Sequence, residues 1–170
     1  EEKARKKEVK PKQEINLTEE EQEQARQNAE KFLEELKEQL PEGTTYKIEK
    51  TKQGLNISLN SEKLGYLIGY RGETLYAMQN VLTAIVGKNI KNRVRVILDI
   101  EGYKAKREKT LQDLAVKVSK TVIKTKKPVK LEPMQAYERK IIHSALQSNP
   151  KVETTSIGEE PYRRIVVSLK

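Results

Sequence analysis

The sequence contains no cysteine and only one histidine among its 170 residues. Without thiols there is no disulfide, no thiolate nucleophile and no Cys/His metal cluster. A reducing compartment such as the cytoplasm agrees with this composition. No apolar run approaches the roughly 20 residues that a membrane-spanning helix needs. The sequence therefore predicts neither a metal site nor an integral membrane segment.

Aromatic residues are also scarce, with seven tyrosines, one phenylalanine and no tryptophan. Few surfaces are thus available on which single-stranded bases could stack. The formal charge of +9 indicates a polyanionic partner, either nucleic acid or an anionic membrane surface. Residues 17–40 hold three Lys or Arg against eight Glu, a net charge of −5. Residues 103–140 hold twelve Lys or Arg against four Asp or Glu, a net charge of +8, so the positive field lies in the second half.

The first 102 residues predict a linker followed by one small domain. Residues 1–16 mix charges of both signs, which is typical of a charged flexible linker. Thr18 and Glu21 form a capping-box pattern ahead of a helix that ends near Pro41. Two alternating strands around "TKQG" then predict a hairpin. Ser61 is expected to cap a short helix, which is followed by a turn at 69–72, a longer helix to about 87 and a strand at 92–100.

After Gly102 the helix and strand signals begin again, which indicates a second domain over residues 103–170. A helix to about residue 127 has an apolar face and an opposite face of lysines. "PVKLE" predicts a short strand, and Pro133 fits the first turn of a helix that ends near Leu146. Two final segments around "EEPY" predict a hairpin. The predicted fold class is α+β, with two small domains of order αββααβ (residues 17–102) and αβαββ (residues 103–170).

The stretch "LIGYRGETL" places Gly69 and Gly72 where a helix begins. Glycine lets the backbone approach a ligand closely, and the N-terminus of a helix attracts anions through its N–H groups and dipole. A phosphate fits such a turn, with Arg71 as a further positive charge and Tyr70 beside a sugar or base. The stretch resembles the signature of the KH domain, and the order of elements resembles its type II form. That resemblance implies a loop that clamps the backbone of unpaired nucleotides, with an apolar groove along Leu64, Leu67, Ile68 and the helix that starts at Glu73.

The stretch "MQAYERKIIHSAL" places Arg139 and His143 four positions apart, and therefore on one face of a helix. Together with the following "TTSIGEEPYRRIVV", it resembles the R-three-H domain, a family that binds single-stranded nucleic acids. The resemblance implies that Arg139 and His143 face the nucleic acid. It makes Lys140, Arg163 and Arg164 candidate phosphate contacts.

A KH domain followed by an R-three-H domain resembles the bacterial Jag family, the SpoIIIJ-associated proteins also called KhpB or EloR. The resemblance implies a cytoplasmic protein that binds single-stranded RNA, with single-stranded DNA as an alternative ligand. It further implies a small single-KH partner or a homodimer, and a post-transcriptional role in cell elongation or envelope growth near a membrane insertase. Members carry a further N-terminal domain, so we expect an upstream segment before Glu1.

Three other classes of function are open on the residues alone. An enzyme would need a nucleophile, a carboxylate pair or a metal, and the single imidazole lies beside an arginine, so we expect no catalytic residues and no cofactor. The lysine face of the helix expected over residues 104–127 would suit anionic lipid, although its opposite face is needed for a core. A protein-interaction adaptor near the insertase, recruited through the acidic first helix, is the main alternative to RNA binding.

Overall fold

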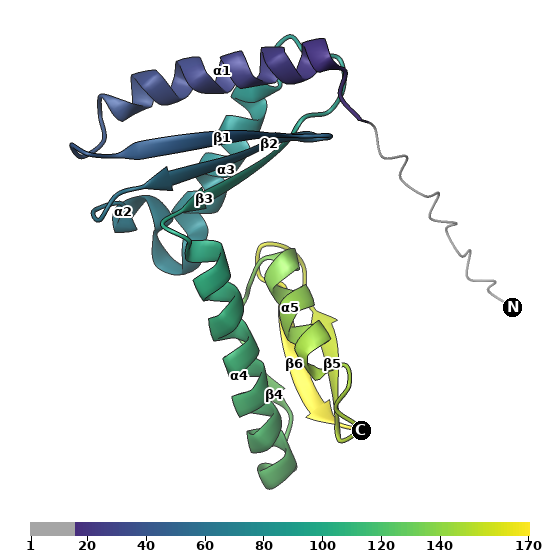
Figure 1. Cartoon of the computed structure of the whole chain (residues 1–170). Helices are drawn as coiled ribbons and strands as arrows, with labels where there is room; N and C mark the ends of the chain where they lie inside the picture. Colours follow the sequence, from purple (N-terminus) through teal and green to yellow (C-terminus); the bar gives the residue numbers. More distant parts are fainter. Residues whose placement is uncertain (1–15) are drawn as a thin grey trace, which may run out of the picture. The chain divides into compact units, whose positions relative to one another are not determined.

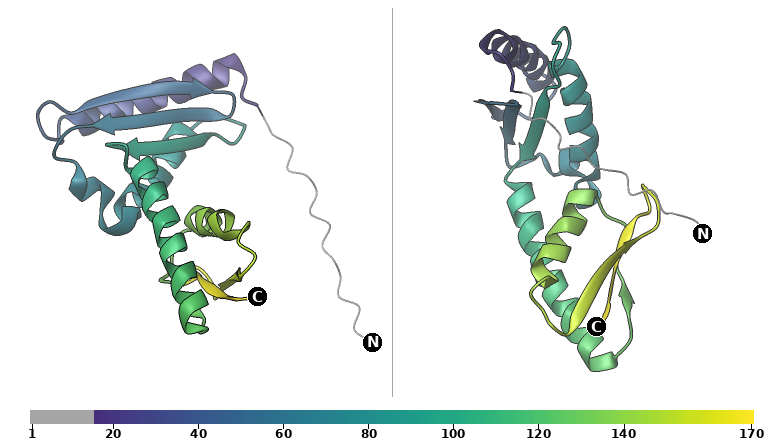
Figure 2. Two further views of the ribbon diagram at one scale, coloured as in Figure 1. Left: turned by 60° about the horizontal axis from the view of Figure 1, so that its bottom comes forward. Right: turned by 90° about the vertical axis from the view of Figure 1, so that its right-hand side faces the viewer.

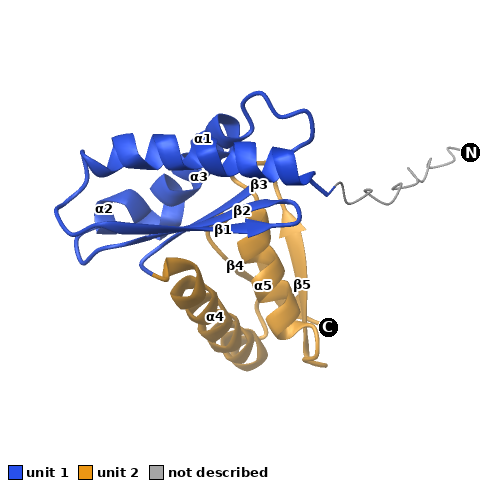
Figure 3. Cartoon of the chain, turned by 45° about the horizontal axis from the view of Figure 1, so that its top comes forward, with its two compact units in different colours: residues 1–101 blue, residues 102–170 orange. Residues whose placement is uncertain are grey.

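A computed structural model of the chain describes residues 16–170 (Figure 1). The predicted flexible linker, residues 1–16, lies outside the described residues except for Asn16. The chain divides into two compact units, residues 1–101 and residues 102–170, which Figure 3 shows in blue and orange. Each unit has its own three-stranded sheet.

Unit 1 has the order αββααβ that the sequence predicts. Its elements are α1 (Glu19–Lys37), β1 (Thr45–Thr51), β2 (Gly54–Asn60), α2 (Gly65–Ile68), the 3-10 helix η1 (Tyr70–Gly72), α3 (Glu73–Val86) and β3 (Arg95–Ile100). Strand β2 lies in the centre of the sheet, antiparallel to β1 and parallel to β3. Parallel strands need a crossover connection, and α2, η1 and α3 supply it.

One face of the unit 1 sheet forms the core. The alternating apolar residues of β2 and β3 are buried in pairs, as Leu55 with Val96 and Ile57 with Leu98. Helices α1 and α3 contact each other and cover this face (Figures 1 and 2). Because side chains alternate along a strand, the opposite face of β2 carries polar residues such as Asn56.

The start of α1 agrees with the sequence, whereas the start of α2 does not. Thr18 accepts a hydrogen bond from the Glu21 N–H, and Glu21 accepts one from the Thr18 N–H, which confirms the capping box. The prediction that Ser61 caps the short helix is wrong. Helix α2 begins at Gly65, Leu64 occupies the capping position, and the Leu64 N–H donates to Glu101 Oε1 at 3.0 Å. Glu101, distant in sequence, thus takes the role that a local capping residue usually has.

Unit 2 has the predicted order αβαββ. Its elements are α4 (Tyr103–Thr125), β4 (Val129–Lys130), α5 (Ala136–Leu146), β5 (Val152–Ile157) and β6 (Arg164–Leu169). Strand β6 lies between β4 and β5 and is antiparallel to both. The two units together confirm the α+β fold class and the predicted order of elements in each domain.

Helices α4 and α5 lie side by side against the sheet of unit 2 (Figures 1 and 2). The core combines apolar residues of both helices with those of the strands, among them Leu111, Val122, Ile142 and Val167. The prediction that Pro133 begins the second helix is wrong, because α5 begins at Ala136. The loop that contains Pro133 instead pairs with the chain ahead of β6, where the Met134 N–H donates to the Arg163 carbonyl at 3.2 Å.

Candidate nucleic-acid interface

Gly69 joins α2 to η1 in a backbone conformation that only glycine adopts readily. Its φ is 71° and its ψ is −175°, a region that is nearly closed to residues with a side chain. A Cβ at this position would lie 2.2 Å from Thr74 Oγ1 and 3.1 Å from the Thr74 nitrogen. Gly69 is therefore required both for the turn and for the close approach of the first turn of α3.

Tyr70 and Arg71 form the outer part of this turn. Arg71 has a φ of 52° and Gly72 has a φ of 81°, so both residues bend the chain toward α3. Tyr70 is 67% exposed, and the Arg71 guanidinium carbon lies 4.9 Å from the centre of its ring. This is the geometry of a cation–π contact. The turn therefore presents an aromatic ring and a positive charge side by side.

The expected supply of free N–H groups at the start of α3 is only partly met. The Gly72 N–H donates to the Gly69 carbonyl at 3.4 Å, and the Glu73 N–H donates to the Tyr70 carbonyl. These donors hold the turn together instead of pointing at a ligand. The dipole of α3 still favours an anion at this end, but the positive charge that an incoming phosphate meets comes mainly from Arg71.

The α2 side of the apolar groove expected beside the turn is smaller than predicted. Leu67 and Ile68 in α2 are half-buried, so each presents part of its side chain to solvent. Leu64 is fully buried and belongs to the core of unit 1, which corrects its expected place in the groove. On the α2 side, the apolar surface beside the turn is therefore short.

In unit 2, Arg139 anchors the connection between β5 and β6. Its Nη1 donates to the Met134 carbonyl at 2.7 Å, and its Nη2 donates to Glu160 Oε1 at 2.7 Å. The Arg139 side chain is only 11% exposed, whereas that of Glu160 is 57% exposed. The guanidinium of the sequence motif is therefore already engaged by a carboxylate within the same unit.

His143 lies one turn further along α5 and is exposed. Its Nδ1 is 2.5 Å from Thr154 Oγ1 in β5. Lys140, on the same helix, is exposed as well. Arg139 and His143, one helical turn apart, thus join one face of α5 to the β5–β6 hairpin at two points.

Arg163 and Arg164 also bond within the hairpin. Arg163 donates to Ser156 Oγ at 3.0 Å and to the Gly158 carbonyl at 3.2 Å. Arg164 donates to the Tyr162 carbonyl at 3.2 Å, and the Tyr162 side chain is 71% exposed. Helix α5 and the hairpin therefore gather the candidate residues on neighbouring elements, although much of their hydrogen-bonding capacity is used internally.

Sequence reasoning missed one buried ion pair. Glu138 is 3% exposed, accepts a 2.7 Å hydrogen bond from Arg107 Nε in α4, and also accepts the Gln135 N–H at the start of α5. A signal was present, because Glu138 falls three and four positions before Ile141 and Ile142 and so lies on the apolar side of α5. A carboxylate in that place needs a cation beside it.

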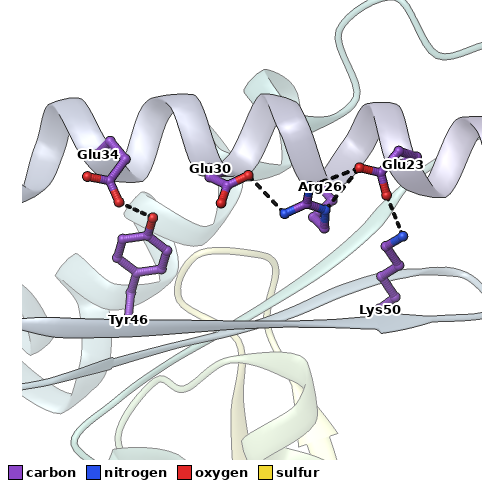
Figure 4. Close-up of polar contacts among 6 residues, drawn as sticks. All are labelled: Glu23, Arg26, Glu30, Glu34, Tyr46 and Lys50. Carbon is purple, nitrogen blue, oxygen red and sulfur yellow. Dashed lines mark hydrogen bonds and ion pairs between the residues drawn. The ribbon is translucent and has the colours of Figure 1, made fainter.

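Several carboxylates of the acidic helix α1 pair with side chains of β1 or of α1 itself (Figure 4). Hydrogen bonds from Arg26 and from Lys50 lower the pKa of Glu23 to about 2. Tyr46 donates its hydroxyl to Glu34, which raises the pKa of Tyr46 to about 12. These carboxylates stabilise the packing of α1, which reduces the charge that the helix offers to a basic partner.

Across residues 16–170, no group of three or more His, Cys, Asp or Glu side chains is arranged to hold a metal ion. None of the helices in the same range is long and apolar enough to cross a bilayer.

Comparison with known proteins agrees with the two units. The family model described as "KhpA/KhpB, KH domain" matches residues 26–98, and the model of the R-three-H domain matches residues 109–169. The chain is 40% identical over 141 residues to the RNA-binding protein KhpB of Clostridium symbiosum, a match that covers 82% of this chain and 64% of that protein.

Two further relatives carry the same name. The match to RNA-binding protein KhpB of Bacillus subtilis has 35% identity over 146 residues and covers 85% of this chain and 70% of the relative. The match to the protein of Lactiplantibacillus plantarum has 37% identity over 114 residues and covers 67% of this chain and 35% of the relative. The chain thus spans less than two thirds of the Clostridium and Lactiplantibacillus proteins. By these matches the chain belongs to the KhpB family, also called the Jag family, in which a KH domain precedes an R-three-H domain.

Proposed function

We propose that the chain binds single-stranded RNA, with the Gly69–Gly72 turn as its central contact. The observation that carries this proposal is the turn itself, where an exposed Tyr70 and a partly exposed Arg71 stand at the start of α3 beside the half-buried Leu67 and Ile68. A phosphate beside Arg71 would leave the adjoining bases against the apolar side of α2. The relatives that share this domain order are named RNA-binding proteins.

In this proposal the KH domain (residues 17–102) and the R-three-H domain (residues 103–170) each supply a separate set of RNA contacts. Gly69, Tyr70, Arg71 and Gly72 hold one stretch of the strand. A second set, on α5 and the hairpin, contacts phosphates and consists of Arg139, Lys140, His143, Arg163 and Arg164. Because both sets belong to one chain, a strand that reaches both binds more tightly than either domain alone would hold it.

Family membership supports the wider role. We propose a cytoplasmic post-transcriptional regulator, connected with cell elongation or envelope growth and placed near the membrane by its partners. Single-stranded DNA would compete for the same surfaces, since phosphate contacts do not depend on the sugar. No catalytic step and no cofactor belong to this proposal.

The test is a competition between two forms of one RNA. A labelled single strand is displaced from the full chain by a loop-containing RNA or by the same sequence in a fully paired form. The loop-containing form should compete better, because the groove accepts splayed bases and does not open a stable duplex. Equal competition would indicate charge attraction alone and would contradict the proposal.

The alternative is a protein-interaction adaptor, and one observation favours it. A hollow of about 400 Å³ lies between α1 and the end of α3, lined by the half-buried apolar side chains of Phe32 and Ile85 and by polar residues such as Asn28 and Lys31. A small single-KH protein or a second copy of this chain would fit such a surface. Replacing Phe32 by Ser should then abolish complex formation in light-scattering measurements while RNA affinity remains unchanged.

A further inference from the structure

Helix α4 carries five lysines on one side, which together form the lysine stripe: Lys106, Lys109, Lys117, Lys120 and Lys124. At about 100° per residue they fall within an arc of about 80°. All five are exposed, and Asp113 is the one acidic residue within the arc. With a rise of about 1.5 Å per residue, the stripe is about 27 Å long.

The lysine stripe points away from the rest of unit 2. The buried residues of α4, such as Leu111, Ala115 and Val122, lie on the opposite side of the helix and pack against α5 and the sheet. Arg139 and His143 lie on another helix, α5, and bond to Glu160 and Thr154 of the β5–β6 hairpin. The stripe is therefore a surface separate from the R-three-H motif.

The lysine stripe differs from the R-three-H arginines of unit 2 in having no internal partners among the described residues. The arginines are engaged: Arg107 pairs with Glu138, Arg139 pairs with Glu160, and Arg163 bonds to the hairpin backbone. By contrast, none of the five stripe ammonium groups has a hydrogen bond or an ion pair with any residue from 16 to 170. An incoming phosphate would compete with these internal partners at the arginines but would displace only water from the lysines.

We propose that the lysine stripe is a second binding track, which holds the phosphodiester backbone of the RNA without reading its bases. This inference rests on the proposed function and adds a face of unit 2 to it. Lysine acts as a flexible point charge and not as a rigid bidentate fork, so it follows a backbone of variable path. Val116 is the one large apolar side chain that α4 exposes, so the helix offers no platform for base stacking.

An anionic membrane is the less favoured occupant. Helices that lie on a membrane insert an apolar face below the headgroups, and charge attraction adds to that insertion. The apolar face of α4 is buried in the core of unit 2, so lipid would be held by charge alone. A flexible nucleic-acid strand can follow the length of the stripe without insertion, which matches a helix that is polar on its outer face.

The test compares two triple variants of the full chain. The stripe variant replaces Lys117, Lys120 and Lys124 by Gln, which lowers the charge by three and keeps good helix formers in α4. The matched control replaces three exposed lysines outside the stripe by Gln and so changes the net charge equally: Lys37, Lys88 and Lys151. Affinities for single-stranded poly-uridine and poly-adenosine of equal length are measured across a salt series. Binding to vesicles of phosphatidylcholine and phosphatidylglycerol is measured in parallel.

The stripe variant should bind about tenfold more weakly to both RNAs, and its plot of log affinity against log salt should flatten by about 2, at about 0.7 for each lost contact. The control should change the slope by less than a quarter of that amount. Equal changes in both variants would overturn the proposal, because net charge would then explain them. Unchanged RNA binding by the stripe variant, with or without loss of vesicle binding, would overturn the stripe while leaving the turn at Gly69–Gly72 in place. If the unaltered chain binds neither RNA, the proposed function fails, and the stripe fails with it.

Discussion

The conformation of Gly69 gives a prediction whose size follows from the structure. Replacing Gly69 by Ala introduces a Cβ at a φ of 71° and a ψ of −175°, 2.2 Å from Thr74 Oγ1. The backbone strain alone costs on the order of 1–3 kcal/mol. The Thr74 hydroxyl can rotate away, but the Thr74 nitrogen at 3.1 Å cannot move without shifting α3. We expect unit 1 to lose about 2 kcal/mol, or about 10 °C in its melting temperature.

The assay is amide hydrogen exchange of β2, the central strand of unit 1, because its slowest amides report the opening of that unit and not of the whole chain. Gly65 provides the control, since it begins α2 and a Cβ there has open space within 4 Å. Replacing Gly65 by Ala should be neutral or stabilising by about 0.4–1 kcal/mol. Adding Thr74→Ala to Gly69→Ala should recover less than half of the loss. If Gly69→Ala were as stable as Gly65→Ala, the assigned turn geometry would be wrong.

Three further predictions follow from the polar contacts. Arg107→Ala should destabilise unit 2 by about 3–5 kcal/mol in urea unfolding, because Glu138 would remain buried without its cation. Adding Glu138→Gln should restore part of the lost stability, and no recovery would contradict the ion pair. The lowered pKa of Glu23 stabilises the fold above about pH 4.5, and this contribution is lost as the pH falls toward 2. The raised pKa of Tyr46 stabilises the fold below pH 10, and this contribution is lost as the pH rises toward 12. Glu23→Gln and Tyr46→Phe should each flatten the dependence of unfolding free energy on pH in its own window, and an unchanged dependence would refute the assignments. Glu160→Gln should raise RNA affinity about two- to fivefold, because it releases the Arg139 guanidinium for a phosphate. A fall in affinity would show that the Arg139–Glu160 pair shapes a surface that the RNA needs.

Sequence periodicity predicted the elements well because local patterns determine them. Helix α1 shows this most clearly, since its capping box and its buried Ala25, Ala29 and Leu33 can be read from spacing alone. The α4 helix agrees in the same way, with Leu111 and Val122 buried opposite the lysines. The errors came where distant residues act, as at α2, where Glu101 and not Ser61 receives the first N–H group.

The candidate site was less predictable, because spacing gives the face on which a residue lies but not the partners it has there. The motif placed Arg139 and His143 on one face of a helix, and the structure places them so. Nothing in the spacing indicated that Glu160, 21 positions later, would bind the Arg139 guanidinium. The turn at Gly69 was easier to predict, since its chemistry depends on consecutive residues.

The most direct test of RNA binding through the Gly69–Gly72 turn is the affinity of a variant with Tyr70→Asp and Arg71→Asp. The matched control is Lys88→Asp with Asn89→Asp at the opposite end of α3, which changes the charge equally and includes a residue with a φ of 62°, close to the 52° of Arg71. Titration with a labelled single-stranded RNA should show at least a tenfold loss for the turn variant, because two carboxylates would face the phosphate. The control should lose less than threefold. A correctly folded turn variant with unchanged affinity would contradict the account.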